Sequence, residues 1–137
     1  MMARDAWKAV AITSQSDIVM ARRQARETAA QLGFGNADQT RLATAVSELT
    51  RNVIQYAGSG ECRIRDASDA NFRRITIVVE DHGPGIANLE LAMQDGYSTC
   101  GGLGAGLPGT RRLVDRFSIE SDPGLTVVTI SMLARKS

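Results

Sequence analysis

The 137-residue sequence lacks any apolar run long enough to span a bilayer. Its first residues, MMARDAWK, carry charges where a signal peptide needs an apolar core, so we expect a cytoplasmic protein. One histidine and two distant cysteines, Cys62 and Cys100, argue against a structural zinc site and predict two reduced thiols. The net charge is only +1 and no basic stripe occurs, so we expect neither nucleic acid nor a membrane surface as a partner.

What is present is the composition of a globular domain, with 43% hydrophobic and 23% charged residues. A chain of 137 residues suffices for one domain, which we place at residues 1–137, and is too short for two ordinary ones. A domain of this size buries roughly two-thirds of its unfolded surface, so its core needs no disulfide or metal.

Hydrophobic periodicity predicts a mixture of helices and strands. Helices are expected from a capping box at Ser14 and Asp17 to Leu32, from about Asp38 to Ala57, at Leu89–Gln94 and near Ala105–Val114. Strands are expected at Trp7–Thr13, Cys62–Asp66, Arg73–Asp81, Phe117–Ser121 and Leu125–Leu133. Most strands are linked by hairpins, so the order favours an α+β sandwich with helices on one face of a largely antiparallel sheet.

Glu48 and Asn52 are spaced i and i+4, so they share one face of the second predicted helix. A helical wheel places both at the edge of the apolar stripe, where side chains can line a pocket. A carboxylate there can act as a general base toward a hydroxyl or water, and an amide oxygen suits Mg²⁺. Taken alone, however, the pair is more simply explained as a solvated helix face.

The segment Asp81–Gly85 directly follows the apolar run Ile75–Val79. The carboxylate of Asp81 should therefore emerge at the end of the sheet beside the core, where it needs a hydrogen-bond donor. The exocyclic amine of a purine would provide one. Gly83 and Gly85 permit backbone angles and close approaches that a Cβ would prevent. An acidic, glycine-containing turn is the simpler alternative if nothing else is considered.

A glycine-rich segment precedes the last predicted helix, and it consists of Gly101, Gly102, Leu103, Gly104, Ala105, Gly106 and Leu107. Its exposed N–H groups and the helix N-terminus would suit phosphates, whereas a flexible linker is the alternative reading. A P-loop is excluded because no lysine occurs between Lys8 and Lys136. Residues 104–109 match G-x-G-x-x-G but follow a loop instead of a strand, so a Rossmann site is excluded too.

In this order, Glu-x-x-x-Asn on a helix, Asp-x-Gly-x-Gly after a strand and Gly-x-Gly before a helix resemble the Bergerat ATP-binding fold. That fold defines the GHKL superfamily of gyrase, Hsp90, histidine kinases and MutL. The resemblance covers nearly the whole chain and is nearest to the RsbT-type serine/threonine switch kinases. It is carried by LGFG at 32–35, AVSELTRN at 45–52, and the segments DGYST at 95–99 through LPG at 107–109.

The resemblance implies a role for each position in a site for ATP and Mg²⁺. Glu48 would be the general base toward a serine or threonine hydroxyl, and Asn52 would bind the Mg²⁺ that bridges the phosphates. Asp81 would accept a hydrogen bond from the adenine amino group. The other nucleotide-binding positions would be Gly83, Gly85, Ile86, Thr99, Thr126 and a lid formed by Gly101–Leu107.

One feature of this site is unusual. No lysine or arginine lies between Arg74 and Arg111, so the lid itself offers the γ-phosphate no cation. Mg²⁺ and backbone N–H groups would then neutralise most of its charge, unless Arg111, Arg112 or a partner contributes.

Other members of the superfamily have requirements that this sequence does not meet. Histidine kinases need a phospho-accepting histidine in a dimerising hairpin, and gyrase-like or MutL-like ATPases need a following domain that supplies a lysine. The resemblance therefore implies a kinase that phosphorylates STAS-domain antagonist proteins of a stressosome-like complex and then activates a PP2C-type phosphatase. The alternative is an ATP-dependent anti-sigma factor that sequesters a sigma factor. A pseudokinase is disfavoured by the presence of Glu48.

Overall fold

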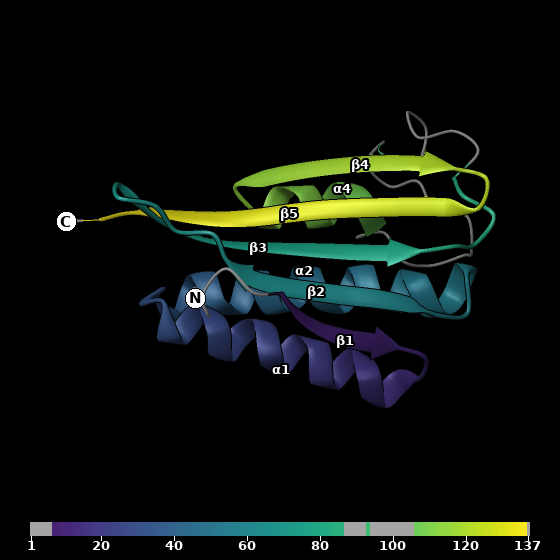
Figure 1. Cartoon of the computed structure of the whole chain (residues 1–137), viewed down its shortest axis with the longest axis horizontal. Helices are drawn as coiled ribbons and strands as arrows, with labels where there is room; N and C mark the ends of the chain where they lie inside the picture. Colours follow the sequence, from purple (N-terminus) through teal and green to yellow (C-terminus); the bar gives the residue numbers. More distant parts are fainter. Residues whose placement is uncertain (1–6, 87–92, 94–105, 137) are drawn as a thin grey trace.

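The computed structural model describes residues 7–86, 93 and 106–136 (Figure 1). In chain order its elements are β1 (Lys8–Ile12), α1 (Gln15–Gln31), α2 (Asn36–Tyr56), β2 (Gly60–Asp66), β3 (Phe72–Asp81), α4 (Gly106–Leu113), β4 (Arg116–Asp122) and β5 (Leu125–Arg135). These bounds agree with the predicted elements to within about three residues. The helix predicted at Leu89–Gln94 lies outside the described residues, apart from Met93.

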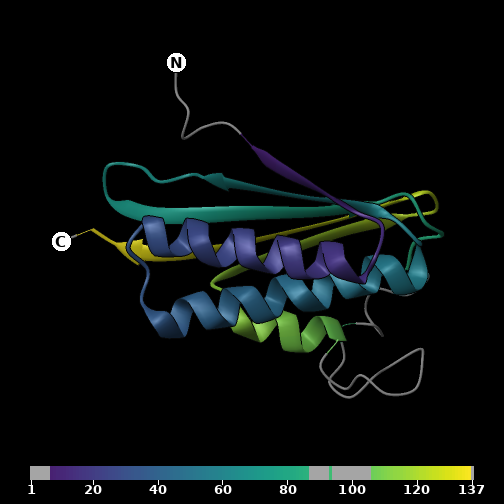
Figure 2. The same ribbon diagram turned by 90° about the horizontal axis from the view of Figure 1, so that it is seen from below.

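The strands form one antiparallel sheet in the order β1-β2-β3-β5-β4. Figure 2 shows α1, α2 and α4 on one side of this sheet, with α4 alongside α2. The prediction of an α+β sandwich is therefore confirmed. No helix in the described ranges is both long enough and apolar enough to cross a membrane.

Alternation along the strands builds the core. Ile75, Ile77 and Val79 on β3 are almost fully buried, and they pair with equally apolar residues of β5. Two helices cover this face, and α1 contributes the small side chains Ala21 and Ala25, which let it pack closely. Burial of each large aliphatic side chain contributes about 1.5–3 kcal/mol, so the covered face stabilises the fold.

The capping box predicted at the start of α1 is wrong in its chemistry. Ser14 is the N-cap residue, but its side chain makes no capping hydrogen bond. Instead, Oδ2 of Asp17 accepts hydrogen bonds from the backbone N–H and the hydroxyl of Thr13, at 2.8 and 2.7 Å. These hydrogen bonds lower the pKa of Asp17. The carboxylate therefore fixes the turn that leads from β1 into the helix.

Candidate functional site

The first part of the site lies on α2. Glu48 and Asn52 are both half-buried, while Leu49 and Val53 between and beside them face the core. The Glu48 side chain is 18% exposed and accepts a hydrogen bond from Nη1 of Arg51, with Oε2 at 2.6 Å. The two predicted residues therefore occupy the edge of the buried face, and a guanidinium holds the carboxylate in place.

The second part is a row of residues at the end of the sheet. Asp81 is paired with Gly60 on one side and with Thr126 on the other. Because strand residues alternate, Asp81 lies on the same, helix-facing side as Val79. A Cβ added to Gly60 would lie 2.8 Å from Cγ1 of Val53 and 3.2 Å from Cβ of Asp81. The absence of a side chain at Gly60 thus lets α2 and Asp81 approach each other closely.

The loop after β3 is held on both sides. A Cβ on Gly83 would lie 2.6 Å from Cβ of Ala57, at the end of α2. Gly85 has a φ of +84°, and a Cβ there would lie 2.6 Å from the carbonyl oxygen of Asp122. Both glycines are therefore required by close contacts, as the sequence predicted, although the surfaces that they contact were unknown.

Among the described residues, one oxygen of Asp81 is engaged and the other is available. Oδ1 accepts a hydrogen bond from the N–H of Gly83 at 3.0 Å. Within the described ranges, Oδ2 has no hydrogen-bond partner. The carboxylate can thus hold the loop with one oxygen and accept a ligand amine with the other.

Ser121, which sequence reasoning missed, links two predicted residues. Its Oγ accepts a hydrogen bond from the N–H of Ile86 at 2.8 Å and lies 2.7 Å from Oγ1 of Thr126. Thr126 is only 8% exposed. Further along, the N–H of Gly124 donates to the carbonyl of Gly83 at 2.9 Å. The loop is therefore fastened to the β4–β5 hairpin, and Ile86 and Thr126 belong to one hydrogen-bonded unit.

The third predicted part is described only where it enters α4. Gly106 is the first residue of this helix, and Pro108 falls in its first turn, as predicted. Leu107 is buried in the core, so a ligand could contact its backbone but not its side chain. The first N–H groups of a helix lack partners within it. Thr99 and the lid residues 101–105 lie outside the described residues.

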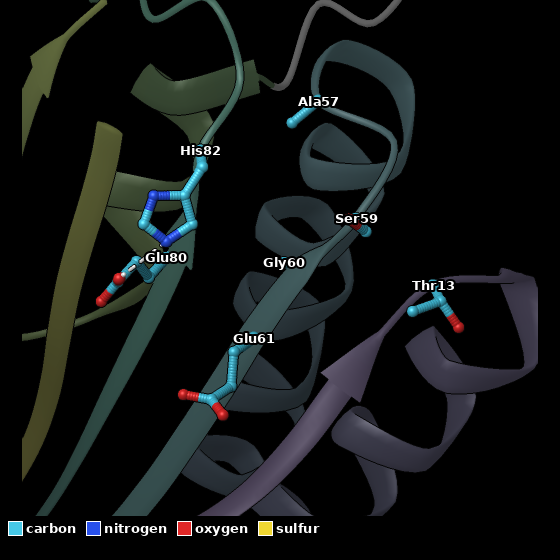
Figure 3. Close-up of a pocket in the computed structure, with 7 residues that line it drawn as sticks. All are labelled: Thr13, Ala57, Ser59, Gly60, Glu61, Glu80 and His82. Carbon is cyan, nitrogen blue, oxygen red and sulfur yellow. Dashed lines mark ion pairs between the residues drawn. The ribbon is translucent and has the colours of Figure 1, made fainter. Parts of the chain in front are cut away.

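Figure 3 shows a pocket at the same end of the sheet. Its lining consists of Thr13, Ala57, Ser59, Gly60, Glu61, Glu80 and His82. Nε2 of His82 lies 3.3 Å from Oε2 of Glu80. None of Glu48, Asn52 and Asp81 lines it, so this pocket is distinct from the predicted nucleotide site.

The residues present suit a magnesium ion held mainly by a ligand. No group of three His, Cys, Asp or Glu side chains in the described part of the chain could hold a metal. Asn52 can offer one amide oxygen beside Glu48. Mg²⁺ commonly binds one or two protein oxygens and takes the rest from phosphates and water, so this donor set fits Mg²⁺ brought by a nucleotide.

Comparison with known proteins identifies the family of the chain. The family model of the histidine kinase-like ATPase domain matches residues 13–132. Serine/threonine-protein kinase RsbT of Bacillus subtilis (strain 168) is 50% identical over 115 residues, which cover 84% of this chain and 86% of that protein.

Two solved structures show the same fold. A Mycobacterium tuberculosis protein with RsbU and RsbW domains has a TM-score of 0.65 at 19% identity; the match covers 95% of this chain but only 33% of that one. The mycobacterial sensor histidine kinase MprB has a TM-score of 0.55 at 20% identity, covering 96% of this chain and 100% of that one. The chain therefore belongs to the histidine kinase-like (GHKL) ATPase family, and within it to the RsbT-like members.

Proposed function

We propose that this chain is an ATP-dependent protein serine/threonine kinase with Glu48 as its general base. The observation that carries the proposal is the close approach of α2 to Asp81 beside Gly60, made through Val53, on the helix that also bears Glu48 and Asn52. The 50% identity to a serine/threonine-protein kinase supports the same reaction.

At the adenine end, Oδ2 of Asp81 would accept a hydrogen bond from the exocyclic amine. Oδ1 is already occupied by the N–H of Gly83, so the carboxylate is oriented before the ligand arrives. Gly83 and Gly85 would form the floor of this end. Thr126 and Ile86, joined through Ser121, would complete it.

At the phosphate end, Asn52 would contribute an oxygen to the Mg²⁺ that ATP brings. The N-terminus of α4 at Gly106 would face the phosphates, together with Thr99 and the lid Gly101–Leu107. The bound ion would neutralise charge on the phosphates. Arg51, the cation beside Glu48, is already paired with that carboxylate, so the uncharged lid leaves this neutralisation to the ion and to backbone N–H groups.

In the transfer step, Glu48 would accept the proton of a serine or threonine hydroxyl. The hydroxyl oxygen bonds to the γ-phosphorus as the bond to the β–γ bridging oxygen breaks, and ADP leaves. Within the described part of the chain, the contact from Nη1 of Arg51 to Oε2 leaves Oε1 available for this proton. Arg51 thus serves as a positioning residue for the base.

The partners are proposed from the resemblance to the RsbT-type switch kinases. The acceptors would be STAS-domain antagonist proteins of a stressosome-like complex, and the released kinase would activate a PP2C-type phosphatase. The similarity to RsbT over 84% of the chain supports a partner-switching kinase. Sequestration of a sigma factor, with ATP bound but no phosphate transferred, is the competing function, and the assay below distinguishes the two.

The first test is binding. A ligand at about 100 times its dissociation constant stabilises the folded state by roughly 2.7 kcal/mol, which a thermal shift detects easily. We expect Mg-ATP to raise the Tm of the wild type, and Asn52→Ala to lose most of that rise. The exposed Asn36→Ala at the start of α2 is the matched control. An absence of any shift in the wild type would contradict nucleotide binding.

The second test is transfer to a STAS-domain protein. Because general base catalysis contributes typically 10²–10⁴-fold, Glu48→Gln should lower the transfer rate by about that factor while Mg-ATP still raises its Tm. Glu27→Gln, an exposed change on α1, should leave both readouts unchanged. If Glu48→Gln transfers phosphate at the wild-type rate, the assigned base is wrong. ATP-dependent binding of a sigma factor without transfer would favour the competing function.

A further inference from the structure

The register of the sheet places one residue of each strand in a row across the helix-facing side. The row consists of Ile12, Gly60, Asp81, Thr126 and Ser121. Residues directly opposite each other in neighbouring strands point to the same face. Figure 1 shows that β5, which bears Thr126, lies between β3 and β4. The row therefore begins with an aliphatic residue and a glycine, and it ends in three adjacent polar side chains.

Ser121 stands at the outer end of this row and makes two hydrogen bonds. Its Oγ accepts the N–H of Ile86 at 2.8 Å and lies 2.7 Å from Oγ1 of Thr126. At that distance one hydroxyl donates to the other. A hydroxyl has a single proton and can accept two hydrogen bonds, so the direction of this bond decides which residue keeps a proton to donate elsewhere. Thr126 is buried and Ser121 is half-buried, which makes a proton without an acceptor costly.

The bond between the two hydroxyls can run in two directions. If Thr126 donates, the oxygen of Ser121 accepts two hydrogen bonds, and its own proton has no acceptor among the described residues. If Ser121 donates, its proton and its oxygen are both used, and the remaining proton belongs to Thr126. Thr126 is paired with Asp81, so this proton lies at the candidate nucleotide site, where a ligand can accept it. Ser121 thus favours Thr126 as a donor.

We propose that Ser121 is a positioning residue that fixes Thr126 as a hydrogen-bond donor and thereby makes the site selective for adenine. This inference rests on the proposed nucleotide site, in which Oδ2 of Asp81 is an acceptor and Thr126 beside it becomes a donor. Adenine presents the matching pattern, an exocyclic amine beside the acceptor N1, whereas guanine presents a carbonyl beside an N–H. A water between Thr126 and the base would keep this order, because a water that accepts from Thr126 has its own protons left to donate.

Ser121 therefore has two effects that a substitution would remove together. In Ser121→Ala, the hydroxyl of Thr126 is free to turn, so it can accept an N–H of a base as readily as it donates to a ring nitrogen. The change also leaves the N–H of Ile86 without its acceptor, which should loosen the loop and weaken the binding of every nucleotide alike. The ratio of the dissociation constants of two nucleotides separates these effects, since the second one cancels.

The test compares ATP with isoguanosine triphosphate, a purine nucleotide that keeps the exocyclic amine but carries an N–H at N1. Titration calorimetry of the full chain with Mg²⁺ measures the Kd of each. We expect the wild type to bind ATP more tightly. The ratio of the two constants should fall by about fivefold or more in Ser121→Ala, because Thr126 can then pair with that N–H. In a Thr126→Val background, Ser121→Ala should leave the ratio unchanged, because Ser121 acts through Thr126.

Further variants at the same position and one control complete the test. Ser121→Thr keeps the hydroxyl and should retain the wild-type ratio. Ser121→Cys fills the same space with a weaker donor and should give an intermediate ratio, so the test does not depend on the folding of Ser121→Ala. The matched control is Ser118→Ala, a serine of the same strand on the open face, the side of the sheet opposite the helices (Figure 2). It should leave both constants unchanged.

The outcomes distinguish this inference from the proposed function. If both constants rise together in Ser121→Ala and their ratio stays the same, Ser121 only holds the loop, and the inference is overturned although ATP binding stands. A change of the ratio that persists in the Thr126→Val background would overturn it as well. An absence of nucleotide binding by the wild type would overturn the proposed site, and this inference with it.

Discussion

The helix and the loop that build the site differ in how they use their residues. On α2, Glu48 and Asn52 project from the edge of the buried face of a regular helix, where both side chains are half-buried. In the loop after β3, the backbone itself packs against its neighbours, because Gly83 and Gly85 leave no room for a methyl group. The candidate catalytic and metal-binding side chains thus lie on a regular helix, whereas the loop is shaped by the close contacts of its glycines.

This difference predicts that the loop tolerates substitution least. Gly85→Ala combines a φ of +84° with a Cβ only 2.6 Å from a backbone oxygen of Asp122, which cannot rotate away. We expect a loss of about 2–3 kcal/mol in the free energy of unfolding, and a Tm lower by roughly 5–15 °C. Chemical denaturation measures the first quantity and calorimetry the second.

The matched control is Gly124→Ala. Its φ is +92°, but no atom lies within 4 Å of an added Cβ, so only the backbone strain remains. We expect a loss of about 1 kcal/mol there. Equal losses at the two positions would show that the loop is not held by the hairpin, and the comparison would fail.

Asp81→Asn should change binding more than stability. The amide can still accept the N–H of Gly83, but it presents donors where Oδ2 would meet the adenine amine. A lost hydrogen bond to a charged acceptor corresponds to about 1.5–3 kcal/mol, so the Kd for ATP should rise by roughly tenfold to a hundredfold. Titration calorimetry measures this Kd, and His82→Asn on the exposed neighbouring position should leave it unchanged.

Arg51→Gln should have a smaller effect, confined to kcat. The Arg51 side chain is 38% exposed, and partly exposed ion pairs contribute up to about 1 kcal/mol, so we expect kcat to fall by about twofold to fivefold. The Kd for ATP and the Tm should not change, and Arg51→Lys should recover part of the rate. A fall in Tm with no change in kcat would assign Arg51 to structure alone.

Cys62 is buried in the core, and ionisation of its thiol should change the free energy of unfolding at alkaline pH but not near neutral pH. Burial raises the pKa of its thiol to about 12 from 9.0, so the folded chain retains a proton that the unfolded chain releases above pH 9.0. The free energy of unfolding should therefore fall as the pH rises from about 9 toward 12, and Cys62→Ala should show a shallower fall. In a Cys100→Ser background, thiol reagents should modify Cys62 only through unfolding. Rapid modification of the native protein would contradict its burial.

The sequence predicted the elements well because their signals are local. The β-branched run before Asp81 and the apolar stripe of α2 each specify an element within one segment. Arg51 could have been found as well, since it stands three residues after Glu48 on the same helix. The capping box failed because Thr13 and Ser14 compete for the same carboxylate, and spacing alone does not rank them.

The contacts of the loop could not be predicted in the same way. The bond from Ile86 to Ser121 joins residues 35 positions apart, and it depends on the register of β4 against β5. The contact of Gly83 with Ala57 depends on where α2 ends relative to the sheet. A glycine in the sequence suggests that a neighbouring group lies too close for a side chain. Only the fold determines which neighbour that is.

The position of Asp81 has a consequence for how this chain can change length. It faces α2 because it stands two, four and six positions after Val79, Ile77 and Ile75, and alternate residues of a strand share a face. Insertion or deletion of one residue within that stretch would turn the carboxylate to the open face and bring Glu80 or His82 toward the helix. The turn at residues 67–71, at the other end of the sheet, can vary in length without this effect. In related chains, gaps should therefore accumulate before β3 and be absent between Ile75 and Asp81.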